Sequence, residues 1–316
     1  MKYNRNGHNR RLNMGNEVVI NQVIILFLTM ITGFVAKKRN IINDKTTKKL
    51  SEILLRITLP AMIIFSCNQE FSKELLAKSG IMLVYSLSIH TFGILVGNVI
   101  YWKYSNDMKN VLKFVTIYSN CGYMGLPLLE ALYGQIGILY ASIYITVFNI
   151  FTWTNGVMIF TGEKDIKSMK KALINPGIIA VFIGLIIFIF SIRLPYPVLK
   201  TLEMFGTMTT PLSMLIIGAL IANMDFKKLF SGFTLYYITI IRLIVLPLLV
   251  LIVLKLSGIT DTMLLGTCVT TAALPAAANT AIFAERYNGE SAFASRIVAF
   301  STIASMITIP IILSLV

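Results

Sequence analysis

The chain has 316 residues, of which 56% are hydrophobic and 13% charged, and its formal net charge is +14. Its mean hydropathy is +0.77, and long apolar runs recur throughout. These values exclude a soluble domain and predict an all-α polytopic membrane protein. The runs are continuous rather than alternating, which argues against a β-barrel. The basic residues lie in short loops, so they indicate membrane topology rather than nucleic-acid binding.

Ten apolar spans are predicted after a polar N-terminal tail of residues 1–17. They lie at about 18–36, 50–66, 79–101, 110–132, 136–160, 174–192, 197–222, 231–256, 262–284 and 292–315. The second span is the weakest, because it contains Arg56 and Pro60. A basic linker, 161–173, could form a short surface helix on the cytoplasmic side. It separates a first five-helix repeat at 18–160 from a second at 174–316.

The fourth and ninth spans are interrupted at their middles. Segments 115–127 and 269–280 each begin with Val-Thr, 154 residues apart, and each contains Gly or Pro. Paired interruptions in the two halves of a membrane protein are typical of transporter binding sites. Five spans per half is an odd number, so the second half enters the membrane from the opposite side. We therefore predict a 5+5 inverted repeat with helices 4 and 9 broken, which supports alternating access.

Lys and Arg are concentrated in the loops that follow odd-numbered spans. By the positive-inside rule these loops are cytoplasmic and both termini are extracytoplasmic. The basic tail opposes this orientation, and translation from Met14 would remove its four positive charges. We expect a multi-pass protein of the plasma membrane, which in a bacterium is the inner membrane.

The first interruption contains Ser119, Asn120 and Gly122. A half-helix that starts here would direct its positive end toward a carboxylate. Gly122 would allow close approach of a ligand or of another backbone segment. We therefore expect these three residues to bind substrate. The alternative is that Asn120 only satisfies the kinked backbone.

The second interruption contains Pro275, Asn279 and Thr280. Pro275 removes one helical donor, and Asn279 is the expected second polar contact to the substrate. The run Ala276-Ala277-Ala278 between them is also suited to close helix packing, so a purely structural role is the alternative.

Arg242 lies near the middle of the eighth span, where a charge usually faces a cavity or a partner. It could attract an organic anion or pair with a carboxylate. His90, midway along the third span, is a candidate proton-coupling group, although such a histidine more often makes a single hydrogen bond. Glu130 and Glu285 lie at the far ends of the broken spans. They are candidate proton sites, with simple solvation at a helix end as the favoured alternative.

No phosphate-binding loop, metal cluster or hydrolytic triad is recognisable, so neither an enzyme nor a cofactor is expected. A transporter of organic anions is favoured over a cation carrier, because no Asp or Glu lies in the middle of a span. A proton- or sodium-coupled carrier of another solute remains an alternative. A non-transporting receptor or scaffold would need an added domain, for which the loops are too short.

The residues around both interruptions resemble the auxin efflux carrier family, which includes bacterial permeases related to the plant PIN-formed carriers. The similarity extends over about Met14–Val316. Its specific matches are Asn120, 124–129, Tyr133-Gly134, Asn175-Pro176-Gly177, Leu274-Pro275 and 283–288. The resemblance implies the fold shared with bile-acid/sodium symporters and sodium/proton antiporters, with helices 4 and 9 crossing at the membrane centre.

The resemblance also implies how such a protein would work. Spans 1, 2, 6 and 7 would form a scaffold, and the other spans would carry small organic anions by an elevator-like movement, in a homodimer. Plant members carry a proline at each crossover, and the matching positions in this chain are Ser119 and Thr280. Bacterial members suggest a small acid such as malate rather than auxin.

Overall fold

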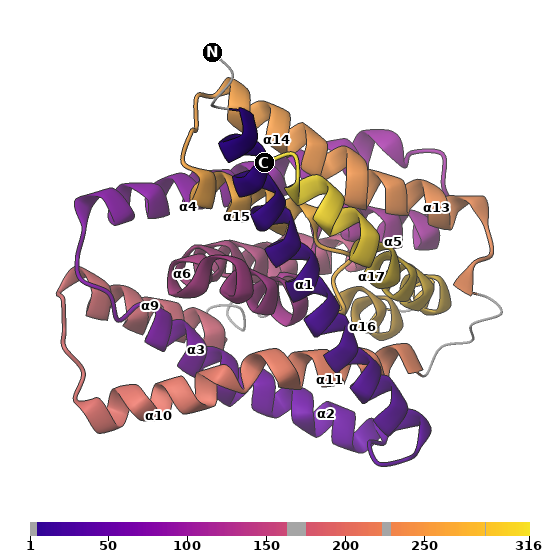
Figure 1. Ribbon diagram of the computed structural model, residues 1–316. Coiled ribbons are helices and arrows are strands. Elements are labelled where there is room, and N and C mark those ends of the chain that lie inside the picture. Colours follow the sequence, from indigo (N-terminus) through magenta and orange to yellow (C-terminus); the bar gives the residue numbers. More distant parts are fainter. Residues whose placement is uncertain (1–4, 163–174, 223–228, 288) are drawn as a thin grey trace.

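The computed structural model describes residues 5–162, 175–222, 229–287 and 289–316, so most of the linker 161–173 lies outside the described residues. The described chain is almost entirely helical (Figure 1). Within these ranges the only β-pairing is an isolated antiparallel bridge between Ser119 and Ala276. The all-α class predicted from the composition is therefore confirmed.

The first half opens with one long helix and continues with shorter ones joined by π-helical turns, labelled η. Its elements are α1 (Arg5–Lys38), α2 (Asp44–Ile53), η1 (Leu54–Thr58), α3 (Leu59–Ser66), α4 (Lys73–Ile100), α5 (Asn106–Ile117), η2 (Cys121–Gly125), α6 (Leu126–Phe151), η3 (Thr152–Gly156) and α7 (Val157–Thr161). Because α1 begins at Arg5, part of the segment assigned to a polar tail is helical. Gly134, with φ of 60°, bends α6 where the fourth predicted span passes into the fifth.

The second half begins at a proline and has a similar series of short helices. Its elements are α9 (Pro176–Ile189), α10 (Tyr196–Thr207), α11 (Thr209–Ala222), α13 (Phe233–Ile240), η4 (Ile241–Val245), α14 (Leu246–Leu256), α15 (Thr262–Ala273), α16 (Asn279–Arg286) and α17 (Ser291–Leu313). The side chain of Asn175 caps α9 by accepting a hydrogen bond from the Gly177 N–H at 2.8 Å.

Within the described ranges, six helical stretches are long and apolar enough to cross a membrane. They are Val19–Lys38, Lys73–Ile100, Cys121–Thr161, Tyr196–Ala222, Phe233–Leu256 and Ser291–Leu313. Two further apolar helices, α9 and α15, are shorter. The ninth predicted span falls below the required length because the chain leaves the helix after Ala273.

The apolar faces of these helices point both inward and outward. On α1, Val23 and Phe27 are buried, whereas Ile24, Leu28 and Ile31 are exposed on the opposite face. Exposed aliphatic side chains at helical spacing are what a lipid-facing surface requires. The chain is therefore a multi-pass protein embedded in the bilayer.

Small residues bring α1 and α11 into close contact. A Cβ atom on Gly33 would collide with the Leu215 carbonyl, and one on Gly218 would collide with the Met30 carbonyl. Membrane helices commonly approach each other closely at small residues. In lipid the hydrophobic effect does not drive helices together, and close approach increases the van der Waals contact that does. These two glycines therefore fix α1 against α11.

Three of the π-turns precede a proline in the same way. Pro60 follows η1, Pro127 follows η2 and Pro247 follows η4, each as the second residue of the next helix. A proline lacks an N–H and its ring crowds the carbonyl four residues earlier. The wider π-turn accommodates both effects without ending the helix. One of these turns, η4, carries Arg242.

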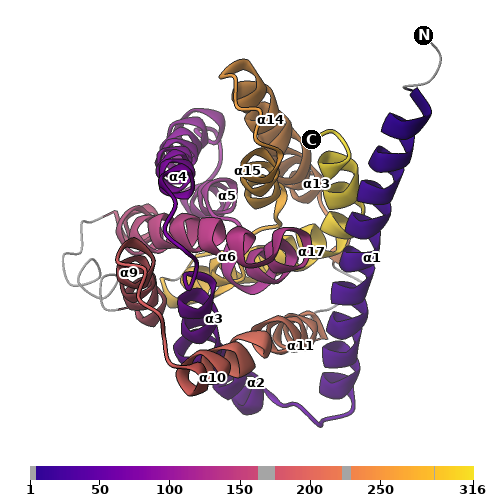
Figure 2. The same ribbon diagram turned by 60° about the vertical axis from the view of Figure 1, so that its left-hand side comes forward.

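The helices form two groups, and each group combines segments that are far apart in the sequence. Figures 1 and 2 show α2, α3, α10 and α11 on one side of the molecule and α4, α13, α14 and α15 on the other, with α6 between them. We call α1–α3 with α9–α11 the first group, and α4–α7 with α13–α17 the second group. Packing is most extensive within each group, as between α1 and α11 or between α16 and α17.

Candidate functional site

Both interrupted segments leave the helix at their middles, and these non-helical parts meet inside the second group. The first lies between α5 and η2, and the second between α15 and α16. Ser119 pairs with Ala276 as an isolated antiparallel bridge. The Asn120 N–H donates to the Pro275 carbonyl oxygen at 2.9 Å. The two segments thus hydrogen-bond to each other's main-chain groups at the point where each helix is broken.

The sequence left open which residue of the second interruption lies at the crossing, and the resemblance only matched Thr280 to a crossover proline of plant members. The residue opposite Ser119 is Ala276 rather than Thr280. Thr280 lies in the first turn of α16, where its hydroxyl donates to the Ala277 carbonyl at 2.7 Å. The Ala277 N–H completes the crossing by donating to the Tyr118 carbonyl at 3.1 Å. The backbone crosses before α16 begins because Pro275 holds the chain extended there.

Arg242 reaches the crossing from η4 and is almost fully buried, with 2% of its surface exposed. Its Nε donates to the Leu274 carbonyl at 3.0 Å, and its Nη1 donates to the Thr116 carbonyl at 3.3 Å. These carbonyls belong to the C-terminal ends of α15 and α5. Among the described residues no carboxylate pairs with Arg242, so that alternative is not supported, whereas attraction of a substrate anion stays a prediction. The guanidinium instead binds two main-chain carbonyls that the breaks leave without helical donors.

The other residues predicted for the first interruption are mostly enclosed. Ser119 and Asn120 are buried, and the Ser119 Oγ lies 3.4 Å from the Tyr144 hydroxyl. Gly122 is half-buried, and a Cβ atom there would meet nothing within 4 Å. Of these three positions, only Gly122 therefore has open space next to it.

His90 is fully buried on α4 and is surrounded by aromatic rings. The ring centroids of Tyr144 and Phe151 lie 5.1 and 5.2 Å from that of the imidazole, with Tyr118 and Phe148 slightly farther away. Its Nδ1 is 2.7 Å from the Ser86 carbonyl. The Nε2 atom has no hydrogen-bond partner among the described residues, so the imidazole makes the single hydrogen bond of the alternative, and proton coupling stays a prediction.

The two candidate carboxylates lie in different surroundings. Glu130 on α6 accepts a hydrogen bond of 2.8 Å from the Thr210 hydroxyl of α11, so it links the second group to the first. Gln69 makes a second link of this kind, because its side-chain amide donates to Gln135 just after the bend of α6. Glu285 is exposed on α16. The fourth span therefore ends in a contact between the two groups, made by Glu130, and the ninth ends in a solvated side chain, Glu285.

A cavity of about 1160 Å³ lies between the two groups. Its wall includes Lys48 and Arg56 of the first group, and Tyr123, Asn279 and Arg296 of the second. Asn279 and Glu285 are the predicted site residues that line it, whereas Ser119, Asn120, Pro275 and Arg242 do not. The structure therefore separates the predicted site into a buried crossing and an accessible cavity.

The basic side chains of this cavity were missed as site residues by sequence reasoning. Lys48 and Arg296 were read as topology signals in loops, and Arg56 only as a weakness of its span. Arg296 donates to the Ser231 hydroxyl at 2.9 Å. The side chains of Lys48 and Arg56 make no hydrogen bond or ion pair with a described residue. The sequence does not show that these residues share a cavity, because this depends on the fold placing α2 and η1 across the cavity from α16 and α17.

The N-terminus of α16 borders the cavity. Ala278, Asn279, Ala281 and Ile282 all line it. The residue before the helix is Ala278, so no side chain caps the first N–H groups. The Thr280 N–H donates to the Ala277 carbonyl at 2.9 Å. The helix end still carries a partial positive charge of about half an elementary charge, which favours an anion. This helix end therefore adds to the positive potential of the basic side chains.

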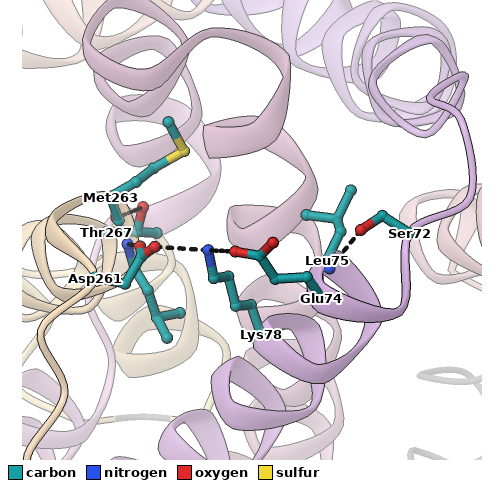
Figure 3. Close-up of polar contacts among 8 residues, drawn as sticks. Ser72, Glu74, Leu75, Lys78, Asp261, Met263 and Thr267 are labelled. Carbon is teal, nitrogen blue, oxygen red and sulfur yellow. Dashed lines mark hydrogen bonds and ion pairs between the residues drawn. The ribbon is translucent and has the colours of Figure 1, made fainter.

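An ion-pair cluster fixes the far end of α15 to α4. Figure 3 shows the Lys78 ammonium between the carboxylates of Glu74 and Asp261, at 2.5 and 2.7 Å. Asp261 also caps α15, because its Oδ1 accepts from the Leu264 N–H at 2.7 Å. The hydrogen bond from Lys78 is the main reason that the pKa of Asp261 lies below its usual value. The cluster anchors the half-helix whose other end reaches Arg242.

These features define a class of protein before any comparison: a polytopic helical membrane protein with two broken helices crossing beside a cavity. No group of three or more His, Cys, Asp or Glu side chains in the described ranges could hold a metal ion. The family model described as "Membrane transport protein" matches residues 18–167 and 163–313. The chain belongs to this family, so the resemblance drawn from the sequence is confirmed, and the protein is a transporter rather than an enzyme.

Curated relatives are also named as transporters. One, from Methanothermobacter thermautotrophicus, is called an "Uncharacterized transporter" and is 22% identical over 94% of this chain and 97% of its own length. Another "Uncharacterized transporter", from Methanocaldococcus jannaschii, is 24% identical over 71% of this chain and 75% of its own. A "Putative malonate transporter" from Rhizobium meliloti is 22% identical over 84% and 86%.

Proposed function

We propose that this chain is a secondary transporter of small organic anions, such as carboxylates, that works by elevator-like alternating access. The observation that carries the proposal is the cavity between the two helix groups. There the uncapped N-terminus of α16 lies in one wall with Lys48, Arg56 and Arg296. Guanidinium, ammonium and free backbone N–H groups are the donors that bind carboxylates in proteins.

The acidic side chains of the cavity do not cancel this preference. Glu52 pairs with Lys49 at 3.0 Å, and Asp44 pairs with Lys37 at 2.7 Å. Neither lysine lines the cavity, and the third carboxylate of the lining, Glu285, is outnumbered by the three basic side chains of Lys48, Arg56 and Arg296. The cavity therefore retains positive charge for a bound acid, and the name of the malonate relative supports a small dicarboxylate.

The finer architecture belongs to the same proposal. We assign the chain a 5+5 inverted repeat of ten spans, with the broken fourth span made of α5, η2 and the start of α6, and the broken ninth of α15 and α16. The first group acts as the scaffold of a homodimer, and the second group moves. Both termini are extracytoplasmic, so the cavity beside α2 faces the cytoplasm. In this assignment the Glu130–Thr210 and Gln69–Gln135 contacts close the opposite side.

Uptake into proteoliposomes tests the proposal. Purified protein is reconstituted, and entry of radiolabelled malonate is compared with protein-free vesicles. The double variant Lys48→Gln/Arg56→Gln should raise the KM for malonate by about tenfold or more, because each lost charge-assisted hydrogen bond is worth about 1.5–3 kcal/mol. Lys45→Gln is the matched control, since this lysine is exposed on α2 but does not line the cavity.

Two results would contradict the proposal. Uptake of malonate, malate and related acids equal to that of empty vesicles would exclude the substrate class. A KM unchanged in the double variant would show that the anion binds elsewhere.

A further inference from the structure

Arg242 lies where two half-helices end, and this position suggests a role beyond packing. The last turns of α5 and α15 both point their carbonyl ends at its guanidinium, which donates to Thr116 and Leu274. We propose that the Arg242 guanidinium is a permanent cation at the crossing. It occupies the place where a transporter of this architecture could otherwise bind a dissociable sodium ion. The proposal rests on the transport function and adds that this chain needs no sodium ion at its crossing.

The hydrogen bonds explain why a cation is needed at this point. In an unbroken helix the Thr116 carbonyl would accept from the N–H four residues later, which belongs to Asn120. The break redirects that N–H to the Pro275 carbonyl at 2.9 Å. The Thr116 carbonyl is thereby left without a helical donor inside the protein, and the Arg242 Nη1 supplies one. The Leu274 carbonyl, beside the second break, receives the Nε in the same way.

The charges balance as well. Each helix C-terminus carries about half a negative elementary charge, so two of them offset about one positive charge. The ionised guanidinium carries that charge, and Arg242 is 2% exposed. A buried charge is tolerated when such partners are present. The Nη2 group of Arg242 has no hydrogen-bond partner among the described residues, and the side chain does not line the cavity.

A sodium ion would use the same partners as Arg242, namely main-chain carbonyls at the ends of half-helices. In transporters with broken helices, unwound carbonyls and half-helix C-terminal ends coordinate the coupling cation. Removal of the guanidinium would leave the Thr116 and Leu274 carbonyls facing a vacated space under two negative helix ends. Such a space is suited to sodium or to free guanidinium. A bulky organic cation such as N-methylglucamine could not enter it.

The first measurement concerns the unaltered protein. Malonate uptake into proteoliposomes should be the same, within about twofold, when sodium is replaced on both sides by N-methylglucamine, because a cation that does not bind cannot shift the equilibrium. Uptake that requires sodium or is driven by a sodium gradient would overturn the proposal.

The second measurement uses Arg242→Ala and does not depend on any substrate. Its thermal unfolding in detergent is recorded in N-methylglucamine chloride, in sodium chloride, and with millimolar guanidinium at equal ionic strength. Sodium or guanidinium should raise the unfolding temperature of this variant but not that of the unaltered protein. Arg193→Ala is the matched control, because this arginine is exposed and does not line the cavity. Equal unfolding temperatures of Arg242→Ala in all three solutions would refute the inference.

A second pair of variants decides the matter if Arg242→Ala does not fold. Arg242→Lys keeps the positive charge, and Arg242→Gln keeps donors but no charge. The lysine variant should fold and remain independent of sodium, whereas the glutamine variant should be less stable without a small cation. Identical behaviour of the two would show that charge at this position is irrelevant. Because unfolding is measured without substrate, a failed malonate assay would leave this result interpretable.

Discussion

The ion-pair cluster at the start of α15 gives a prediction that can be worked out step by step. Asp261 has two roles, since it pairs with Lys78 at 2.7 Å and caps α15 through the Leu264 N–H. Asp261→Asn removes the charge but keeps a capping oxygen, so it should cost about 0.5–1 kcal/mol for a partly exposed pair. Asp261→Ala also removes the cap, which adds about 1 kcal/mol.

The assay is thermal unfolding in detergent at neutral pH. Asp261→Ala should lower the unfolding temperature about twice as much as Asp261→Asn, with a total loss of roughly 1.5–2 kcal/mol. A double-mutant cycle with Lys78→Gln isolates the ion pair, which should vanish when either partner is neutral. Equal losses in the alanine and asparagine variants would show that the cap contributes nothing and would refute the two-role reasoning.

The pH dependence of this pair has a defined sign. The pKa of Asp261 is lowered in the folded protein, mainly by the hydrogen bond from Lys78. The folded state therefore keeps this carboxylate ionised below the unfolded pKa of about 3.9. The stabilisation is complete above that value and is lost as the pH falls through the lower folded pKa. The difference between the unaltered protein and Asp261→Asn should thus be constant from about pH 5 to 8 and shrink in stronger acid.

Two further predictions concern packing and the inter-group contact. Gly218→Ala should destabilise the protein by about 1–3 kcal/mol, because its Cβ would collide with the Met30 backbone, whereas Gly80→Ala, where a Cβ meets nothing within 4 Å, should be neutral or slightly stabilising. Comparable unfolding temperatures of these two variants would contradict the packing argument. Thr210→Val and Glu130→Gln should show a coupling of about 1 kcal/mol in a double-mutant cycle of thermal unfolding; additive losses would mean that their hydrogen bond contributes no coupling.

The sequence predicted where the two helices break but not how they meet. Pro275 and the glycines after Asn120 signal an interruption because their backbone chemistry differs from that of other residues. The residue that pairs with Ser119 is Ala276, and an alanine gives no signal of a crossing. A match of Val-Thr registers also cannot set the pairing, because the pairing depends on main-chain hydrogen bonds that any residue can make.

The charged residues show a second limit. Arg242 is identifiable because an arginine inside an apolar span is rare. Its partners in the structure are main-chain carbonyls, which have no signature in the sequence, so these contacts could not be predicted from it. Lys48 and Arg56, in contrast, cannot be singled out from the sequence at all. They resemble any basic residues near a cytoplasmic loop, and only the folded chain brings them opposite α16.

The crossing is held by main-chain groups, and this has a consequence for divergence among relatives. The bonds from Asn120 to Pro275 and from Ala277 to Tyr118 join backbone atoms only. Apart from Pro275, which holds the chain extended, side chains at these positions could therefore change during evolution without breaking the link between the half-helices. A lineage could therefore change the residues around its substrate one at a time while keeping the same main-chain crossing. Conservation of shape there would then persist after conservation of sequence had faded.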